Sequence, residues 1–129
     1  MKLLNSILRA LPEYQSLLGA LDAPGASAIT GLSSIHRAHM LAAFQEELGR
    51  PMVVVCQDEL AASRMAQELS GFLGMTPPVF PVRELALLGA ATVSRGWEQQ
   101  RLSMLHHLSQ EGYPLLITSI EAMSLRTMP

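Results

Sequence analysis

The stretch Met52-Val53-Val54-Val55-Cys56-Gln57-Asp58 decides the fold of this 129-residue chain. Its first five residues form an apolar, valine-rich run without polar alternation, which is typical of a parallel strand with both faces covered. Asp58 is a favoured residue at a helix N-cap, and the apolar residues after it recur at helical spacing as far as Gly74. A buried strand that leads directly into a capped helix predicts an α/β domain.

The alternation of strands and helices continues along the chain. We expect further buried strands at 26–30 and 114–118, and a proline-rich extended piece at 77–81 that is unsuited to the centre of a sheet. Helices are expected at 34–48, 59–73, 94–111 and 119–125, after an N-terminal helical pair at 2–21 that breaks at Pro12. Residues 82–93 show no clear pattern. Crossover helices of these lengths favour parallel pairing, so we predict one domain over residues 1–129, a three-layer α/β/α fold with a small parallel sheet of about four strands.

The helical periodicity also predicts which side chains face the core. For the helix at 34–48, these are Ile35, Ala38, Leu41, Ala42 and Leu48, and for the helix at 94–111 they are Trp97, Leu102, Leu105 and Leu108. Glycines mark the expected helix ends, at Gly19, Gly49, Gly74 and Gly112.

Composition excludes several classes of protein. Charged residues make up only 16% of the chain, which suggests that part of the surface is covered by another domain or partner. The net charge is −2, so there is no overall positive field to attract nucleic acid. The single cysteine, Cys56, is expected to be a small core residue in a reducing compartment. No apolar stretch is long enough to span a membrane, and a cytoplasmic location is expected.

The loop that should bind phosphate lacks the chemistry to do so. In a parallel α/β domain, phosphate binds between the first strand and its helix, which here means Thr30, Gly31, Ser33 and Ser34. A phosphate loop needs a lysine for the β- and γ-phosphates and a hydroxyl for Mg²⁺, but these positions carry Ser34 and Ile35. We therefore expect Gly31 to form a turn and a serine to cap the helix, with no catalytic residue, no cofactor and no metal site.

Other candidate sites are weaker. The histidines, His36, His39, His106 and His107, lack partners at metal-ligand spacing. Arginines 83, 95, 101 and 126 would form a patch only if folding gathers them. Two alternatives stay open: a nucleotide site whose positive charge comes from Arg37 or Arg95, and a small-molecule enzyme site. The second would use polar residues at the strand ends, Gln57, Asp58, Thr118 and Ser119.

The order of these segments resembles a known family. Thr30-Gly31, a helix, and then the strand-to-helix run 53–62 resemble the first motor segment of the excision-repair protein UvrB, and Leu115 to Met123 resembles its strand and helix before an inserted domain. The missing lysine departs from UvrB. It fits better the N-terminal UvrB-like module (domain 1a) of the bacterial transcription-repair coupling factors, which 80–85 and 94–102 also resemble.

That resemblance implies a function for a larger parent protein. The parent would be an ATP-dependent DNA translocase, a helicase-like hydrolase that displaces stalled RNA polymerase and recruits UvrA during nucleotide excision repair. The present chain would be a scaffold without enzymatic activity. UvrA would be contacted mainly through the following domain, and RNA polymerase and DNA through others. The alternative is the nucleotide-binding domain of a UvrB-like or helicase-like repair ATPase.

Overall fold

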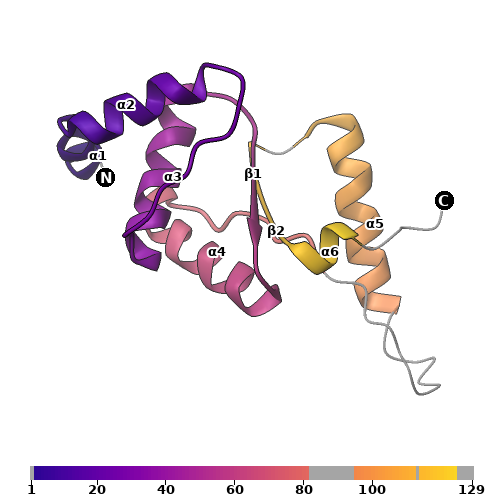
Figure 1. Ribbon diagram of the computed structural model, residues 1–129. Helices are drawn as coiled ribbons and strands as arrows, with labels where there is room; N and C mark the ends of the chain where they lie inside the picture. The colour runs from indigo at the N-terminus through magenta and orange to yellow at the C-terminus, as the bar shows by residue number, and fades with distance from the viewer. Residues whose placement is uncertain (1, 82–94, 113, 125–129) are drawn as a thin grey trace.

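The computed structural model describes residues 2–81, 95–112 and 114–124 of the chain. Two parallel strands, β1 (Met52–Cys56) and β2 (Leu115–Ser119), lie at its centre, with Met52 opposite Leu115 and Cys56 opposite Ser119. Helices α3 (Ser34–Leu48) and α4 (Glu59–Leu73) lie on one side of the strands, and α5 (Arg95–Gln110) lies on the other (Figure 1). The short helix α6 (Ile120–Ser124) follows β2 directly. The predicted α/β class and parallel pairing are confirmed.

β2 is the central strand of the described sheet. All five of its residues are buried, and Ile117 and Ser119 are almost completely so. One edge pairs with β1, while the other forms a parallel bridge from Ile117 to Val79. There the Phe80 N–H donates to the Ile117 carbonyl at 2.7 Å, and the Ile117 N–H donates to the Pro78 carbonyl at 3.0 Å. The proline-rich piece at 77–81 therefore lies at the edge, as predicted.

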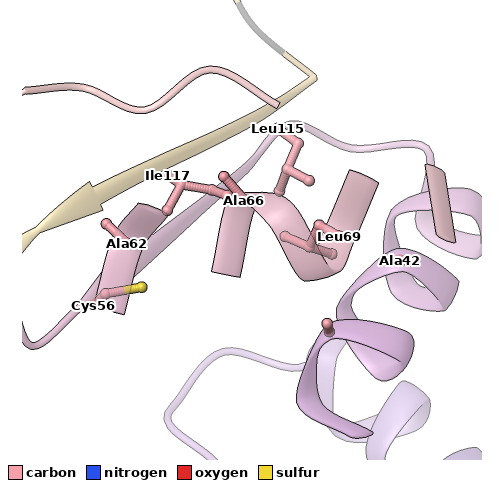
Figure 2. Packing of buried hydrophobic residues seen from close by; sticks show 8 residues of the cluster. Ala42, Cys56, Ala62, Ala66, Leu69, Leu115 and Ile117 are labelled. Carbon is pink, nitrogen blue, oxygen red and sulfur yellow. The ribbon is translucent and has the colours of Figure 1, made fainter. Parts of the chain in front are cut away.

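Small side chains bring α3 and α4 close to each other. Ala38 and Ala42 of α3, and Ala62 and Ala66 of α4, are buried in one cluster with Leu69 and the sheet residues Cys56, Leu115 and Ile117 (Figure 2). Asp58 begins α4, because its carboxylate accepts a hydrogen bond from the Ala61 N–H at 2.7 Å. Gly49 and Gly74 end the two helices in the left-handed conformation that glycine favours.

The N-terminal helical pair packs on the outer side of α3. Helices α1 (Lys2–Arg9) and α2 (Pro12–Leu21) are separated near Pro12, as expected, although Gly19 lies inside α2 and does not end it. Tyr14 of α2 stacks on Phe44 of α3 with 5.3 Å between ring centroids. Tyr14 and Phe44, together with Ala43, are the buried residues of a separate apolar cluster between the N-terminal pair and α3. The pair therefore extends the helical layer and does not contribute to the sheet.

Within the described residues the sheet is smaller than predicted, because 26–30 is not a strand. These residues are irregular and exposed, and Ile29 keeps 44% of its surface accessible. An isolated extended segment needs a neighbour for its backbone groups, and only Ile29 and Thr30 in it are β-branched. Among the described residues, β1 is thus an edge strand rather than an internal one. The face of β1 that carries Val53 and Val55 is also less covered than predicted, since these side chains are 60% and 48% exposed.

The predicted inner faces of α3 and α5 are largely confirmed, with one wrong residue on each helix. Ala38, Leu41, Ala42 and Leu48 of α3 and Leu105 and Leu108 of α5 pack in the apolar clusters. Ile35 and Leu102 are exposed, and the buried residues Ala43, Phe44, Arg101 and Met104 were not predicted. The inner face of α5 consists of residues 101, 104, 105 and 108. It therefore includes position 101 and not the neighbouring Leu102. The polar residue Arg101 belongs to this inner face, and a pattern that counts only apolar residues does not identify it. The side chain of Trp97 and the segment 82–93 lie outside the described residues.

The central position of β2 leads to a stability prediction. Replacing Ile117, which is 0% exposed, with alanine should lower the free energy of unfolding by about 3 kcal/mol, since buried methyl groups are lost and a cavity is left. The matched control is Val53→Ala at the exposed face of β1, which should cost less than about 1 kcal/mol. Urea unfolding followed by circular dichroism measures both values. Equal losses would contradict the assignment of β2 as the centre of the fold.

Candidate functional site

The candidate phosphate loop does not form a phosphate cradle in the structure. No strand precedes it, since 26–30 is irregular, and Thr30 is exposed. Gly31 has a positive φ of 82°, so it forms the expected turn. Ser33 occupies the N-cap position of α3, but its side chain makes no capping hydrogen bond; its hydroxyl lies 3.0 Å from Nδ1 of His36. Ser34 donates from its hydroxyl to the Glu68 carboxylate at 2.5 Å. The expected serine cap is therefore present by position only.

A cleft of about 650 Å³ lies beside the carboxyl end of β1. Its walls come from the loop before α3, from α3 itself and from the start of α4, and include Ile29, Ser34, Arg37, Val55 and Arg64. Among the candidate loop residues only Ser34 lines it; Thr30, Gly31 and Ser33 do not. The structure thus places Arg37 in the same cleft as Ser34, whereas the turn glycine Gly31 does not line this cleft.

The polar residues at the strand ends do not converge as a catalytic site. Asp58 caps α4, and the Ser119 hydroxyl accepts a hydrogen bond from the Ala122 N–H at 3.1 Å, which caps α6 in the same way. Thr118 donates to the Phe80 carbonyl at 3.4 Å, and both Thr118 and Ser119 are almost fully buried. Gln57 lines the cleft with Asp58. Asp58, Thr118 and Ser119 are thus engaged with backbone groups, so their arrangement does not favour the enzyme alternative.

Cys56 and the histidines have structural surroundings. Burial raises the pKa of the Cys56 thiol and the nearby Asp58 charge raises it further, which makes Cys56 a poor nucleophile. It packs in the main core cluster, as predicted. His39 is half-buried, stacks on Phe72 with 5.0 Å between ring centroids, and lies 3.2 Å from the Asn5 side-chain oxygen. Within the described part of the chain, no three His, Cys, Asp or Glu side chains are placed to hold a metal ion.

Arg101 has a structural role, although the sequence indicated only that it could form a patch with three other arginines. It is 4% exposed and its guanidinium lies 4.3 Å from the centroid of the Phe80 ring. It donates to the carbonyl of Pro81 at 2.8 Å and to that of Ala122 at 3.2 Å. Arg101 therefore ties α5 to the segment beside β2 and to α6. Arginines 83 and 126 and the side chain of Arg95 lie outside the described residues, so the patch itself is untested.

The chain is similar to a protein of known identity. The sequence is 33% identical to the transcription-repair-coupling factor of Myxococcus xanthus in an alignment 107 positions long, which covers 77% of the chain. The chain spans 9% of the length of that relative. No family model matches the chain, and no solved structure matches it. None of the helices in the described ranges is long and apolar enough to cross a membrane. The resemblance to the coupling factors that the sequence motifs indicated is confirmed.

The contacts of Arg101 predict that its planar guanidinium group, and not its charge alone, stabilises the fold. Arg101→Met should lower the free energy of unfolding by about 3 kcal/mol, because it removes the contact with Phe80 and leaves two carbonyls without their donor. Arg101→Lys should recover less than half of the loss, since an ammonium cannot reach both carbonyls with a planar fork. Chemical denaturation of the three proteins measures this. Full recovery by lysine would show that Arg101 contributes charge alone.

The environment of His39 predicts a dependence of stability on pH. Burial lowers its pKa from the ordinary value of 6.5, and the neighbouring His36 lowers it further. The unfolded chain therefore takes up a proton before the folded one as pH falls. The contribution to stability is complete above the ordinary value and is lost as pH falls from there towards the depressed pKa.

The matching experiment compares unfolding midpoints at about pH 7.5 and about pH 5, on either side of the ordinary histidine pKa. His39→Gln should show a smaller loss of stability at low pH than the natural chain does. His106→Gln, at an exposed position on α5, should behave like the natural chain. An identical pH response in all three proteins would contradict the role given to His39.

Proposed function

We infer that this chain is a homologue of one segment of the transcription-repair coupling factors, and we propose that it is a non-catalytic scaffold domain of such a protein. The observation that carries this proposal is the likeness to the curated relative over 77% of the chain, together with a loop that has no lysine where a phosphate site requires one. A chain that has the segment order of a motor domain but lacks the lysine of its phosphate loop is suited to a structural role rather than to catalysis.

The proposed role belongs to a larger protein. The parent would be an ATP-dependent DNA translocase that displaces stalled RNA polymerase and recruits UvrA for nucleotide excision repair. Because the chain spans 9% of the relative, motor activity and contacts with DNA and polymerase would reside in other parts of the parent. This domain would hold the neighbouring UvrA-binding region in position, and it would also pack against other domains, in the cytoplasm.

The surface of the domain supports a role in packing. Large apolar side chains are exposed on several elements, among them Val53 at 60%, Ile120 at 59% and Met123 at 60%. Charged residues make up only 16% of the chain, which is low for a protein whose whole surface faces water. The two helical layers pack on opposite faces of β2, and Arg101 ties α5 to Pro81 and to α6, so the domain can transmit a fixed geometry to its neighbours.

The nucleotide-binding alternative has one observation in its favour and more against it. Arg37 lines the cleft beside Ser34, where it could contribute positive charge. The position of the hydroxyl that would hold Mg²⁺, however, carries Ile35, and the lysine position carries Ser34. The strand that would position the loop is not formed. We therefore propose the scaffold role and treat ATP binding as the result that would replace it.

A thermal-shift experiment with Mg²⁺–ATP separates the two. The melting temperature of the chain should change by less than about 1 °C at millimolar nucleotide. A site of micromolar affinity would raise it by on the order of 10 °C, because ligand binding to the folded state adds directly to stability. The Arg37→Glu variant is the control. A large shift in the natural chain that disappears in this variant would establish a nucleotide site and overturn the scaffold proposal.

A further inference from the structure

Helix α1 turns its apolar side to solvent and its polar side to the domain. Leu3 is 75% exposed, Ile7 is 58% exposed and Leu4 is 40% exposed, whereas Asn5 is only 7% exposed. A surface helix ordinarily has the opposite arrangement, with its apolar stripe against the core. Figure 1 shows α1 at the edge of the molecule, on the other side of α3 from the two strands. The orientation of α1 therefore places apolar side chains on the outside of the domain.

Polar contacts with α3 hold α1 in this orientation. The Asn5 side-chain amide donates to the Glu46 carboxylate, and the Asn5 side-chain oxygen lies 3.2 Å from Nε2 of His39. Arg9 forms an ion pair with the Glu47 carboxylate. All three partners belong to α3, so a rotation of α1 that buried its apolar side would break these contacts. A second molecule can cover the apolar side without displacing α1.

The exposed apolar residues are arranged symmetrically about Ile7. Leu3 and Leu11 lie four positions before and after it, and Leu4 and Ala10 lie three positions before and after it. Residues at these spacings are neighbours on a helix surface. The Ala10 N–H donates to the Ile7 carbonyl at 3.2 Å, which continues the helical turn past the end of α1. All five residues are exposed, and we call them the α1 stripe.

Two copies of the α1 stripe complement each other when the helices run antiparallel. A twofold axis through Ile7 places Leu3 of one copy opposite Leu11 of the other. It also places Leu4 opposite Ala10, so that a large side chain meets a small one, as close helix packing requires. No position of the stripe carries a charge, so the facing residues do not repel each other.

The size of this surface predicts a weak association. A contact between two short helices buries less than the roughly 1,200 Å² that a stable complex needs. Apolar surface continues beside the stripe, however, in a groove of about 580 Å³ that Leu11 shares with Leu17 of α2 and with Ile29. This groove adds to the area that a second copy can cover. Association should therefore appear between about 10 µM and about 1 mM protein.

We propose that the α1 stripe is the contact surface of a weak, antiparallel, twofold-symmetric dimer of this chain. The symmetry about Ile7 favours a second copy as the occupant. A twofold contact uses the same residues from both molecules, whereas an unrelated partner needs no such symmetry. The inference goes beyond the proposed function, because it does not depend on whether the domain acts as a scaffold.

Sedimentation equilibrium of the 129-residue chain over that concentration range tests the dimer. The average mass should rise with concentration towards that of two chains. Ile7→Glu puts two like charges on the axis and should weaken the dimer at least roughly tenfold. The matched control is Leu60→Glu, at an equally exposed apolar residue of α4, which should associate like the natural chain. Circular dichroism of both variants should show the helix content of the natural chain, since both positions are exposed.

Disulfide trapping tests the antiparallel register. A disulfide requires two Cα atoms within about 7 Å, so it reports which positions face each other. In a mixture of isotope-labelled Leu3→Cys and unlabelled Leu11→Cys proteins, mass spectrometry should find the mixed disulfide forming faster than either self-disulfide. Cys56 is buried and does not compete.

Each contrary result overturns the proposal. A chain that stays monomeric at about 1 mM would assign the α1 stripe to a different partner. Equal weakening by Ile7→Glu and Leu60→Glu would show association without a defined surface. Faster disulfide formation between two Leu3→Cys molecules would establish a parallel contact and exclude the twofold axis through Ile7.

Discussion

The parallel pairing of β1 with β2 is the constraint on which the rest of the structure depends. β2 lies between two layers of helices and between two extended neighbours, so its residues pack against β1, α4, α5, α6 and the segment beside Phe80. Ile117 faces α4 and Leu116 faces α5, as alternate side chains of a strand must. Without β2 the two apolar clusters would have no common partner, and α5 would have no surface on which to pack.

The elements with strong local signals were predictable from the sequence. Met52–Cys56 and Leu115–Ser119 are short valine- or leucine-rich runs between turns, and α3 and α4 have a cap residue at one end and a glycine at the other. The segment 26–30 was not predictable in the same way. Its five residues contain only two with strong strand preference, and the pairing neighbour that would order them is not found beside them. Strand formation there is decided by tertiary contacts and not by composition.

The candidate site was predictable in its chemistry but not in its geometry. The sequence alone shows that the loop contains no lysine, and this does not depend on how the chain folds. The engagement of Ser34 by Glu68 joins residues that are 34 positions apart, and no local pattern indicates such a contact. Arg101 shows the same limitation, since its partners at Pro81 and Ala122 come from two other segments. Sequence reasoning identifies which groups are present, and long-range packing decides which of them are still free to bind a ligand.

The alanines between α3 and α4 have a consequence for how this domain can change over evolutionary time. Ala38 and Ala62 are completely buried, and Ala42 and Ala66 are nearly so. Such a contact depends on small volume and not on a particular chemical group, so a glycine or serine is tolerated more easily than a valine that would push the helices apart. The surface can therefore diverge freely, and the spacing of the two helices is inherited. A domain built around such a contact keeps the distance between its two helices even when little of its sequence is preserved.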